Sequence, residues 1–504
     1  MAANFANASA IFTRRPKLLI AVGVALFLVL ISFSTSPETI RSHTHKLLQK
    51  SPFSTPYTFR GQAVLEDPHL LEDADDFLDH FKAVVEYPSM PISDSKAGCG
   101  WPDESAINLQ WGYDDTRGDD MKWVIQDEDD YKIELIRKQW QYFVANEMRP
   151  WAEHKKKFHG RGIVIPAGHE KSIYRTKVIL RMLQKLGSTI DVEIAYWGEL
   201  ELKDDVKQQL LDVKPDLFFN DLSIPGQPIP TYYSFMANFQ LKIPAVINSR
   251  FAEVILMDSD NIPIIDPVKL FDSEVYKEFG TVFWPDIVRT RRNNPIWAIT
   301  NTQCRMDEWE QESGQLLVDK RKFWYHLQLA TWLETEHRLY YSTLILGDKD
   351  MFRFAWHALR TKYGVPSRWI TTVGTLSPGE EGKEKVYCGH SFAQHHPDKD
   401  GGIAFLHGGL LKTLSNQVIK WQIEHQGGIF QAYKRVTSDQ DKQFTPNVKI
   451  EWDPAHYLPE EKDENYHTAW CTNFRDDPAH PLDELLPGFQ ETYKEVGGYW
   501  MLDL

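Results

Sequence analysis

The chain has 504 residues, of which 42% are hydrophobic and 25% are charged, as in an ordinary globular protein. This length suffices for one large α/β domain with additions, or for two domains. The formal net charge of −15 argues against nucleic acid as a partner, because a protein that binds a phosphate backbone needs a positive surface.

The N-terminal segment contains an uncharged apolar run, residues 18–33, directly after the basic residues Arg14, Arg15 and Lys17. As a helix the run would be about 24 Å long, enough for a thin bilayer. We interpret it as a transmembrane signal anchor that leaves residues 1–17 in the cytosol. A cleaved signal peptide is the alternative. The Ser-, Thr- and Pro-rich residues 34–60 then form a flexible stem.

The cysteines all follow this segment, so they would lie in an oxidising lumen, where one or two disulfides are expected. Four cysteines allow three pairings, and the sequence does not choose between them. Their spacing shows no Cys-x-x-Cys metal pattern. The sequon Asn7-Ala8-Ser9 falls in the predicted cytosolic tail, so N-glycosylation is not expected. The cysteines are Cys99, Cys304, Cys388 and Cys471.

Residues 61–159 are predicted to form an acidic, helical N-terminal part, with one helix within residues 127–151. Beyond it, short apolar runs alternate with segments of helical period, which predicts a mostly parallel sheet flanked by helices. Ligands of such sheets bind at the carboxyl ends of the strands. The predicted strands are residues 162–168, 191–198, 215–221 and 253–257, and the predicted helices are residues 169–187 and 231–249.

Asp258 and Asp260 end the apolar strand Glu253–Met257 and would point the same way if the extended backbone continued. Two like charges at the end of a buried strand are costly unless a cation lies between them. The pair suits a divalent ion that keeps open positions for a substrate phosphate. An ordinary acidic turn would look the same, but the carboxyl end of a parallel strand favours the metal site.

Eight segments between residues 160 and 412 carry a family resemblance. They are "GRGIVIPAG", "LKIPAVINSRFAEVILMDSDNIPIIDPVKLFDS", "GTVFWPDI", "NPIWAI", "QESGQLLVDKRKFW", "LILGDKDMFRFAWHAL", "YCGHSFAQHHPD" and "IAFLHGGLLK". In this order they resemble the fungal Golgi α-mannosyltransferases of glycosyltransferase family 71. The resemblance implies a GT-A fold for residues 160–504, GDP-mannose as donor, Mn²⁺ as cofactor and retention of the α configuration. It also implies a single-pass type II Golgi membrane protein with a lumenal catalytic domain, and association with other Golgi transferases.

The resemblance also implies roles for donor-site residues. Asp258 and Asp260 would bind the metal that bridges the donor diphosphate, with His407 of "FLHGG" as the third ligand. His390 and the pair His395/His396 are weaker rivals for that position. Gly408 would let backbone approach a phosphate. The other donor contacts are Gly168, Lys242 and Gln315; Arg175 and Arg250 are alternatives to Lys242.

Two acidic segments would serve the reacting sugars. Glu312 would contact the acceptor or a sugar hydroxyl, although Glu312 or Gln315 could instead cap the following helix. Asp348 would bind the transferred mannose or stabilise an oxocarbenium-like centre. Asp350 would be the N-cap of the helix that follows it. The sequence leaves open whether retention proceeds through a covalent glycosyl-enzyme or by same-face attack.

The expected activity is transfer of mannose to mannose residues of glycoprotein glycans or mannan, with an α-1,2 linkage favoured. Two alternatives remain: an α-1,3-mannosyltransferase of the same family, and a membrane-tethered mannan-binding protein without activity. A different sugar nucleotide, such as a UDP sugar, is a further option. Acceptor choice is expected to depend on the helical N-terminal part and on the residues after Lys412.

Overall fold

The computed structural model describes the following parts of the chain: residues 58–59, 62–63, 73–102, 108–111, 128–231, 241–345, 348–378, 385–399, 401–436, 447–452 and 470–503. Two compact units are present, Met1–Val64 and Leu65–Leu504. In the smaller unit β1 (Thr58–Phe59) pairs antiparallel with β2 (Gln62–Ala63). The predicted tail and anchor lie outside the described residues. No helix within the described part is long and apolar enough to cross a membrane.

The larger unit contains a six-stranded sheet in the order β6-β5-β4-β7-β10-β9. The first four strands are parallel, while β10 runs antiparallel to both of its neighbours. The four strands and the helix after the first were predicted, and the mixed sheet confirms that part of the expected fold class. The bounds are β4 Arg161–Pro166, β5 Asp191–Tyr196, β6 Phe218–Asp221, β7 Glu253–Met257, β9 Thr281–Pro285 and β10 Gln311–Asp319.

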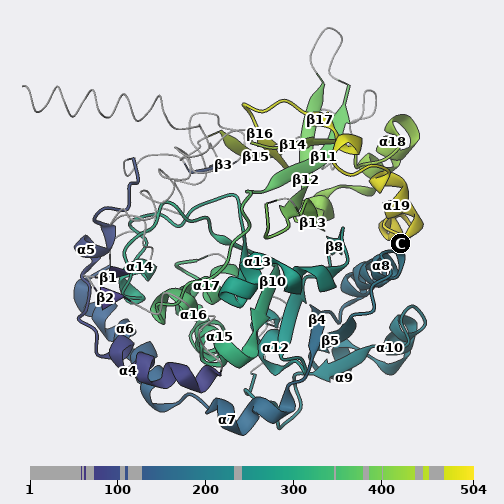
Figure 1. The fold of residues 1–504 in the computed structure, drawn as a ribbon. Helices are drawn as coiled ribbons and strands as arrows, with labels where there is room; N and C mark the ends of the chain where they lie inside the picture. The colour runs from purple at the N-terminus through teal and green to yellow at the C-terminus, as the bar shows by residue number, and fades with distance from the viewer. Residues whose placement is uncertain are drawn as a thin grey trace, which may run out of the picture. The chain divides into compact units, whose positions relative to one another are not determined.

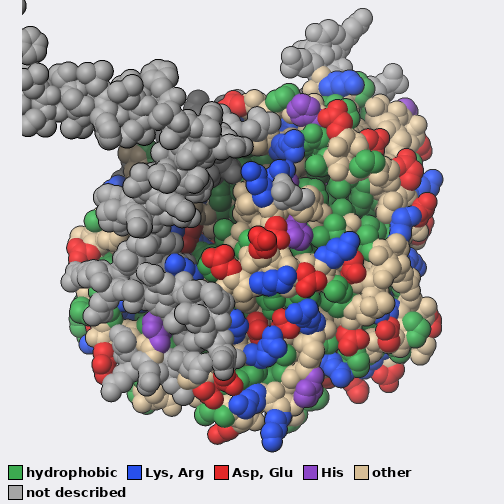
Figure 2. All heavy atoms as spheres, in the orientation of Figure 1, with side chains coloured by type: hydrophobic (Ala, Val, Ile, Leu, Met, Phe, Trp, Pro, Cys, Tyr) green, Lys and Arg blue, Asp and Glu red, His purple; other side chains and the backbone are tan. Residues whose placement is uncertain are grey.

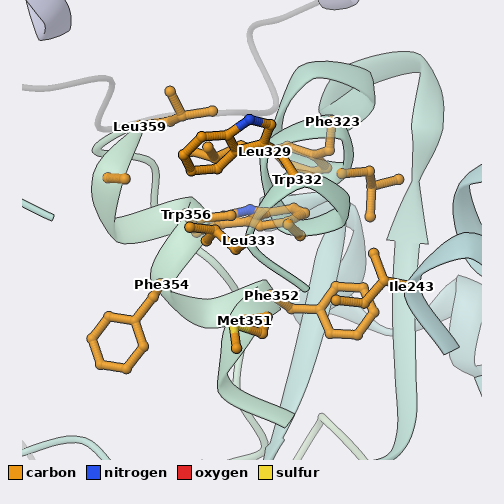
Figure 3. Close-up of a cluster of buried hydrophobic side chains, with 14 of the residues drawn as sticks. Ile243, Phe323, Leu329, Trp332, Leu333, Met351, Phe352, Phe354, Trp356 and Leu359 are labelled. Atoms are coloured by element: carbon orange, nitrogen blue, oxygen red, sulfur yellow. The ribbon is translucent and has the colours of Figure 1, made fainter. Parts of the chain in front are cut away.

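Helices cover both faces of this sheet. The helices α8 (Glu170–Lys185), α10 (Asp204–Leu211) and α13 (Glu274–Phe279) pack on one face. On the other face lie α12 (Lys242–Asn248), α15 (Lys320–Thr335) and α17 (Lys349–Ala358). Figure 3 shows the contact of the last three, where bulky side chains from α15 and α17 interleave beside Ile243. Because β7 reads Glu-Val-Ile-Leu-Met and is buried on both faces, it forms a central strand.

A second sheet, which the sequence did not predict, lies above the first in Figure 1. Its strand order is β17-β14-β11-β12-β16-β15-β3, and all of its pairings are antiparallel except β15–β3. A disulfide between Cys388 of β12 and Cys471 of β16 cross-links it. The bounds are β3 Gln110–Trp111, β11 Thr371–Ser377, β12 Val386–His395, β14 Ala432–Lys434, β15 Val448–Trp452, β16 Trp470–Phe474 and β17 His480–Pro481.

Two strands connect the sheets. The strand β13 (Ile403–His407) pairs with β12 of the second sheet and also with β8 (Asn261–Pro263), which follows β7 of the first. In Figure 1 they lie between the two sheets. This pairing brings the end of β13 beside the turn that follows β7, which is the turn with the acidic pair.

The helical N-terminal part packs on the α15 side of the first sheet. The predicted helix within residues 127–151 is confirmed as α6 (Asp130–Asn146), whose N-cap is Asp129. A second disulfide joins Cys99 to Cys304. The remaining helices are α4 Leu78–Val85, α5 Ile92–Lys96, α7 Trp151–His154, α9 Gly198–Glu201, α14 Ile296–Ile299, α16 Arg338–Tyr341, α18 Asn416–Gln426 and α19 Phe489–Glu495.

Candidate metal and donor site

Asp258 and Asp260 lie in the turn between β7 and β8, and His407 is the last residue of β13. The Asp258 N–H donates to the Gly314 carbonyl of β10 at 2.8 Å, which fixes the start of the turn. His407 pairs in register with Asn261, one residue beyond the acidic pair. Strand pairing therefore brings the three side chains together from distant parts of the chain.

The three side chains form a compact group of possible metal ligands. The His407 Nε2 atom lies 3.2 Å from an Asp260 oxygen and 3.8 Å from an Asp258 oxygen. One donor atom from each residue lies within 4.8 Å of the others. Opposite ligands of one Mg²⁺-sized ion are about 4.2 Å apart, so a small inward movement would complete the site. Two carboxylates and an imidazole fit a divalent transition-metal ion with positions left for a substrate.

Glu312 of β10 orients the histidine ring from its other side. Its Oε2 lies 3.1 Å from His407 Nδ1, and its Oε1 accepts the Gly314 N–H at 2.9 Å. A carboxylate behind a ligand histidine fixes the ring and its tautomer. Glu312 therefore supports the metal site.

The charges of this cluster compensate one another when no ion is present. Burial disfavours a charged imidazole, but Glu312 and Asp260 outweigh it and raise the pKa of His407 well above its ordinary value. Burial likewise opposes ionisation of Glu312, yet His407 lowers its pKa to about 2. The protonated ring thus offsets the negative charge of the neighbouring carboxylates, as a bound cation would. A metal ion must displace the ring proton before it can bind the nitrogen.

Lys242, the first residue of α12, joins a fourth carboxylate to the cluster. Its Nζ lies 2.8 Å from Asp258 Oδ2 and 3.3 Å from Asp348 Oδ2. The same ammonium donates to the Ser313 hydroxyl at 3.0 Å. Burial alone would lower the pKa of Lys242, but Asp258 and Asp348 raise it above its ordinary value, so the side chain carries a full charge.

A cavity of about 240 Å³ opens beside Asp260. Arg175 and Lys412 lie 4.0 and 3.9 Å from Asp260 Oδ2, and Lys171 adds a third cation to the lining. Trp500, which stacks on Tyr174 of α8, forms part of the wall. Figure 2 shows acidic, basic and histidine side chains gathered near the middle of one face. Three cations next to the cluster give this cavity a positive wall, which suits an anionic group such as a phosphate.

A protein-family model described as "Mannosyltransferase putative" matches residues 160–308 and 299–396, which include most of the elements around the cluster. Residues 160–396, just under half of the chain, are similar to this mannosyltransferase family. The match contains both aspartates of the turn, while His407 and Lys412 lie just beyond it.

Similar proteins come from fungi. The chain is 27% identical to "Alpha-1,2-mannosyltransferase MNN22" of Candida albicans, over 47% of each chain. It is 22% identical to "Alpha-1,2-mannosyltransferase MNN5" of Saccharomyces cerevisiae, over 41% of this chain and 44% of the relative. A "Probable alpha-1,3-mannosyltransferase MNT4" of Saccharomyces cerevisiae is 20% identical over 69% and 67%. The chain spans about half the length of the first of these curated relatives.

Solved structures align only partly. The galactosyltransferase LgtC in complex with donor and acceptor sugar analogues aligns over 38% of this chain and 69% of its own. The sequence identity is 12% and the TM-score 0.29. The strand order described above, and not these alignments, therefore defines the fold of residues 160–396.

The structure places other predicted donor residues around the cluster. Gly408 lines the cavity, and its N–H donates to the Asp260 carbonyl at 2.9 Å. Gln315 pairs with Met257 and is fully buried, where its Oε1 accepts from Asn261 at 2.8 Å. The Gly168 N–H donates to the Ser172 hydroxyl, and Gly168 is not part of the cavity lining. Donor contacts of Gln315 and Gly168 stay predictions.

The predicted capping roles are wrong. The N-cap position of α17 belongs to Asp348, whose side chain turns to Lys242 and Ser313 instead of capping. Asp350 lies inside the helix, where its Oδ1 accepts from the Gln311 N–H and from Arg353. The error of two residues arose because an Asp near the start of a helical pattern fits a cap equally well at either position. Neither Glu312 nor Gln315 caps α15, since Asp319 does so.

The rival residues have structural roles. The His390 ring lies 2.9 Å from both the Ile429 carbonyl and the Ser391 hydroxyl. His395 contacts Thr371, and His396 accepts from the Asp398 N–H. Arg250 lies over the Phe218 ring in a separate hollow. No role was predicted for Ser313, Asn261 or the cations Lys171 and Lys412. The sequence signal for Lys412 is its place in the "FLHGGLLK" segment.

Proposed function

We propose that this chain is a retaining α-mannosyltransferase of GT-A type, which transfers mannose from GDP-mannose to a mannose residue of a glycan. The observation that carries the proposal is the meeting of Asp258, Asp260 and His407 beside a cation-lined cavity. A glycosidase has no use for such a cluster, and a sugar-binding protein does not require one. The family match and the names of the relatives support mannose as the transferred sugar.

The donor diphosphate would lie between the cluster and the basic wall. Arg175 and Lys412 neutralise phosphate oxygens there, and Lys171 extends the positive surface over the cavity. When a nucleotide binds, Arg175 and Lys412 leave their contacts with Asp260 and bind the phosphate instead. A bound divalent ion, for which we propose Mn²⁺, would offset the charge on the leaving diphosphate. Electrostatic stabilisation of the leaving group is then shared by three side chains and the ion site.

The transferred mannose would lie on the Lys242 side of the cluster. Asp348 is 4% exposed, and its Oδ1 accepts from the Ser313 hydroxyl at 3.2 Å. Its other oxygen faces only Lys242 among the described residues, so it can accept a sugar hydroxyl. In same-face attack the donor's own phosphate oxygen takes the acceptor proton, and Asp348 positions the sugar. In the covalent route Asp348 would instead be the nucleophile.

Linkage and location belong to the same proposal. An α-1,2 bond is favoured because several of the similar proteins carry that name, and the α-1,3 bond is the alternative. We propose a type II protein of the Golgi membrane with residues 18–33 as anchor. The acceptor would be a glycoprotein glycan or mannan, and the enzyme would associate with other Golgi transferases.

The test uses the full chain, purified in detergent, with GDP-mannose and methyl α-mannoside. We expect mannosyl transfer that depends on Mn²⁺, is removed by a chelator, and is lost in Asp260→Ala. An α-1,2-specific mannosidase then reports the linkage of the product. Absence of both transfer and donor hydrolysis, in a folded chain that still binds mannoside, would support the sugar-binding alternative. Preference for UDP over GDP in calorimetry would refute the donor assignment.

A further inference from the structure

A second cavity, of about 210 Å³, lies at the β9 edge of the first sheet, away from the donor pocket. The walls come from β9, β10, α17 and the segments 307–309 and 363–369. Aromatic side chains supply much of the wall, and polar groups come from both sides. The lining includes Trp284, Glu308, Trp309, Gln311, Arg353 and Trp369.

Gln311, the first residue of β10, is the unusual member of this lining. The residue is 1% exposed, and neither its amide nitrogen nor its amide oxygen has a hydrogen-bond partner among the described residues. Its backbone N–H is satisfied by Asp350. A buried amide without partners is destabilising, and native proteins keep few of them. A ligand that both donates and accepts hydrogen bonds would satisfy it.

The charges around the cavity favour an uncharged ligand. Burial opposes ionisation of Glu308, but Arg305, His357 and Arg353 lower its pKa far below the ordinary value, so the carboxylate is ionised. Asp307 adds a second negative charge to the lining, and Arg368 and Arg353 add two positive ones. The balanced charge gives no preference for a phosphate or a carboxylate. A fixed carboxylate and a free amide together suit hydroxyl groups.

The aromatic wall is rigid before any ligand arrives. The rings of Trp309 and Trp369 stack at 4.2 Å, and Trp369 stacks on Phe474 of the second sheet at 5.1 Å. The guanidinium of Arg289 lies 3.4 Å from the Trp309 ring centre. The Trp369 indole N–H donates to the Asp286 carbonyl at 2.8 Å. Preformed concave sites with apolar walls and few polar groups are typical of ligand pockets.

The cavity and the catalytic cluster share two elements. On β10, Gln311 immediately precedes Glu312, which supports His407. Asp348, the N-cap residue of α17, lies at the cluster, and Arg353 of the same helix lines the cavity. Five residues of helix separate them by about 7.5 Å along the helix axis. Residues only one and five positions apart on these two elements therefore line the cavity and the cluster.

We propose that this cavity binds one hexose of the acceptor glycan, other than the residue that receives the new bond. The Gln311 amide and the Glu308 carboxylate hydrogen-bond its hydroxyl groups, and the tryptophan stack forms the apolar side. The inference rests on the proposed function, because it assigns to that enzyme an acceptor longer than a monosaccharide.

The test compares Gln311→Leu with the wild-type chain, using α-1,2-linked mannotriose and methyl α-mannoside as acceptors. Loss of two hydrogen bonds predicts a KM for mannotriose about tenfold or more higher. The KM for methyl α-mannoside and for GDP-mannose, and the rate of donor hydrolysis, are expected to stay unchanged. Gln209→Leu, on the exposed face of α10, is the matched control. A merely structural Gln311 would give equal KM values for mannotriose, which overturns the proposal.

Direct binding separates this proposal from the proposed function. Mannotriose is titrated into the full chain by calorimetry without donor, and urea unfolding is measured on the same variants. We expect Gln311→Leu to bind mannotriose about tenfold more weakly while unfolding at an equal or higher urea concentration, because an unsatisfied amide has been removed. If transfer is absent but this difference remains, hexose binding by the cavity stands, while its role as an acceptor site fails together with the transferase proposal. Equal binding by both variants, or no binding by the wild type, refutes the cavity proposal.

Discussion

Gly314 tests the geometry of the metal cluster without removing any of its ligands. A Cβ atom at this position would lie 2.8 Å from His407 Nδ1 and 2.9 Å from two ring carbons. Ordinary contacts begin near 3.4 Å, so in Gly314→Ala the ring must withdraw by about 0.6 Å, the difference between 3.4 and 2.8 Å. Asp260 and Glu312 lie 3.2 and 3.1 Å from the two ring nitrogens, so the ring cannot withdraw without lengthening at least one of these contacts.

The size of the effect follows from how closely metal ligands must be placed. Ligand distances in metal sites hold to about 0.2 Å, and disturbing the residues that orient a ligand typically weakens affinity 10- to 100-fold. We therefore expect Gly314→Ala to bind Mn²⁺ more weakly by that factor, or about 1.4–2.7 kcal/mol. Without metal the variant should still fold, since β10 keeps its pairing, with a loss of about 1–3 kcal/mol from the displaced ring.

The assay is calorimetric titration of MnCl₂ into the full chain, repeated in a His407→Ala background. If Gly314→Ala acts through the imidazole, it should have little further effect once the ring is gone. An equal loss in both backgrounds would mean that the methyl group disturbs the aspartate turn or the strand instead. Unchanged Mn²⁺ affinity of the single variant would refute the cluster as a metal site.

Three further predictions concern charge, acid stability and the second sheet. Lys242→Met leaves Asp258 and Asp348 without their buried cation. In the absence of divalent ions the variant should lose about 3 kcal/mol of unfolding free energy, and Mn²⁺ should restore part of it. Equal urea midpoints of variant and wild type would contradict this. Burial lowers the pKa of His390 to about 4, below its unfolded value of 6.5, so its stabilisation is complete above pH 6.5 and lost as the pH falls toward 4. The unfolding free energy of the wild type should therefore fall by about 3 kcal/mol between those pH values, and this fall should be absent in His390→Gln. The control His425→Gln, at an exposed position, should keep it. Urea unfolding at a series of pH values measures both variants. Replacing Cys388 and Cys471 together by Ala opens a loop closed over 83 residues, and should cost about 4–5 kcal/mol in urea unfolding.

Local pattern predicted the four parallel strands of the first sheet, because each is a short, largely apolar run bounded by turn residues. The strand before Asp258 is buried on both faces, and such strands are legible as continuous runs of Val, Ile and Leu. The helix α8 carries its own periodicity between a cap and a glycine. Asp258, Asp260 and His407 were predicted together only through the resemblance, since spacing alone cannot join residues so far apart.

The second sheet escaped prediction for the opposite reason. Several of its strands are short, such as β14 and β17, and β12 contains histidine, serine and glycine beside its apolar residues. Buried polar residues there are stabilised by partners from other strands, as Thr372 is by Tyr387, and no single segment shows this. The partners of Lys242 were hidden likewise, because Asp348 meets it only after α17 packs beside α12.

The pairing of β13 with β8 also determines when the cluster of Asp258, Asp260 and His407 can form. His407 joins Asn261 across about 150 residues of chain, a loop whose closure is slow compared with that of the neighbouring parallel strands. During synthesis the acidic turn emerges long before its histidine partner. The ability to bind a divalent ion at this cluster should therefore develop late in folding, after β12 has formed, and metal uptake would serve as a kinetic marker of the completed fold.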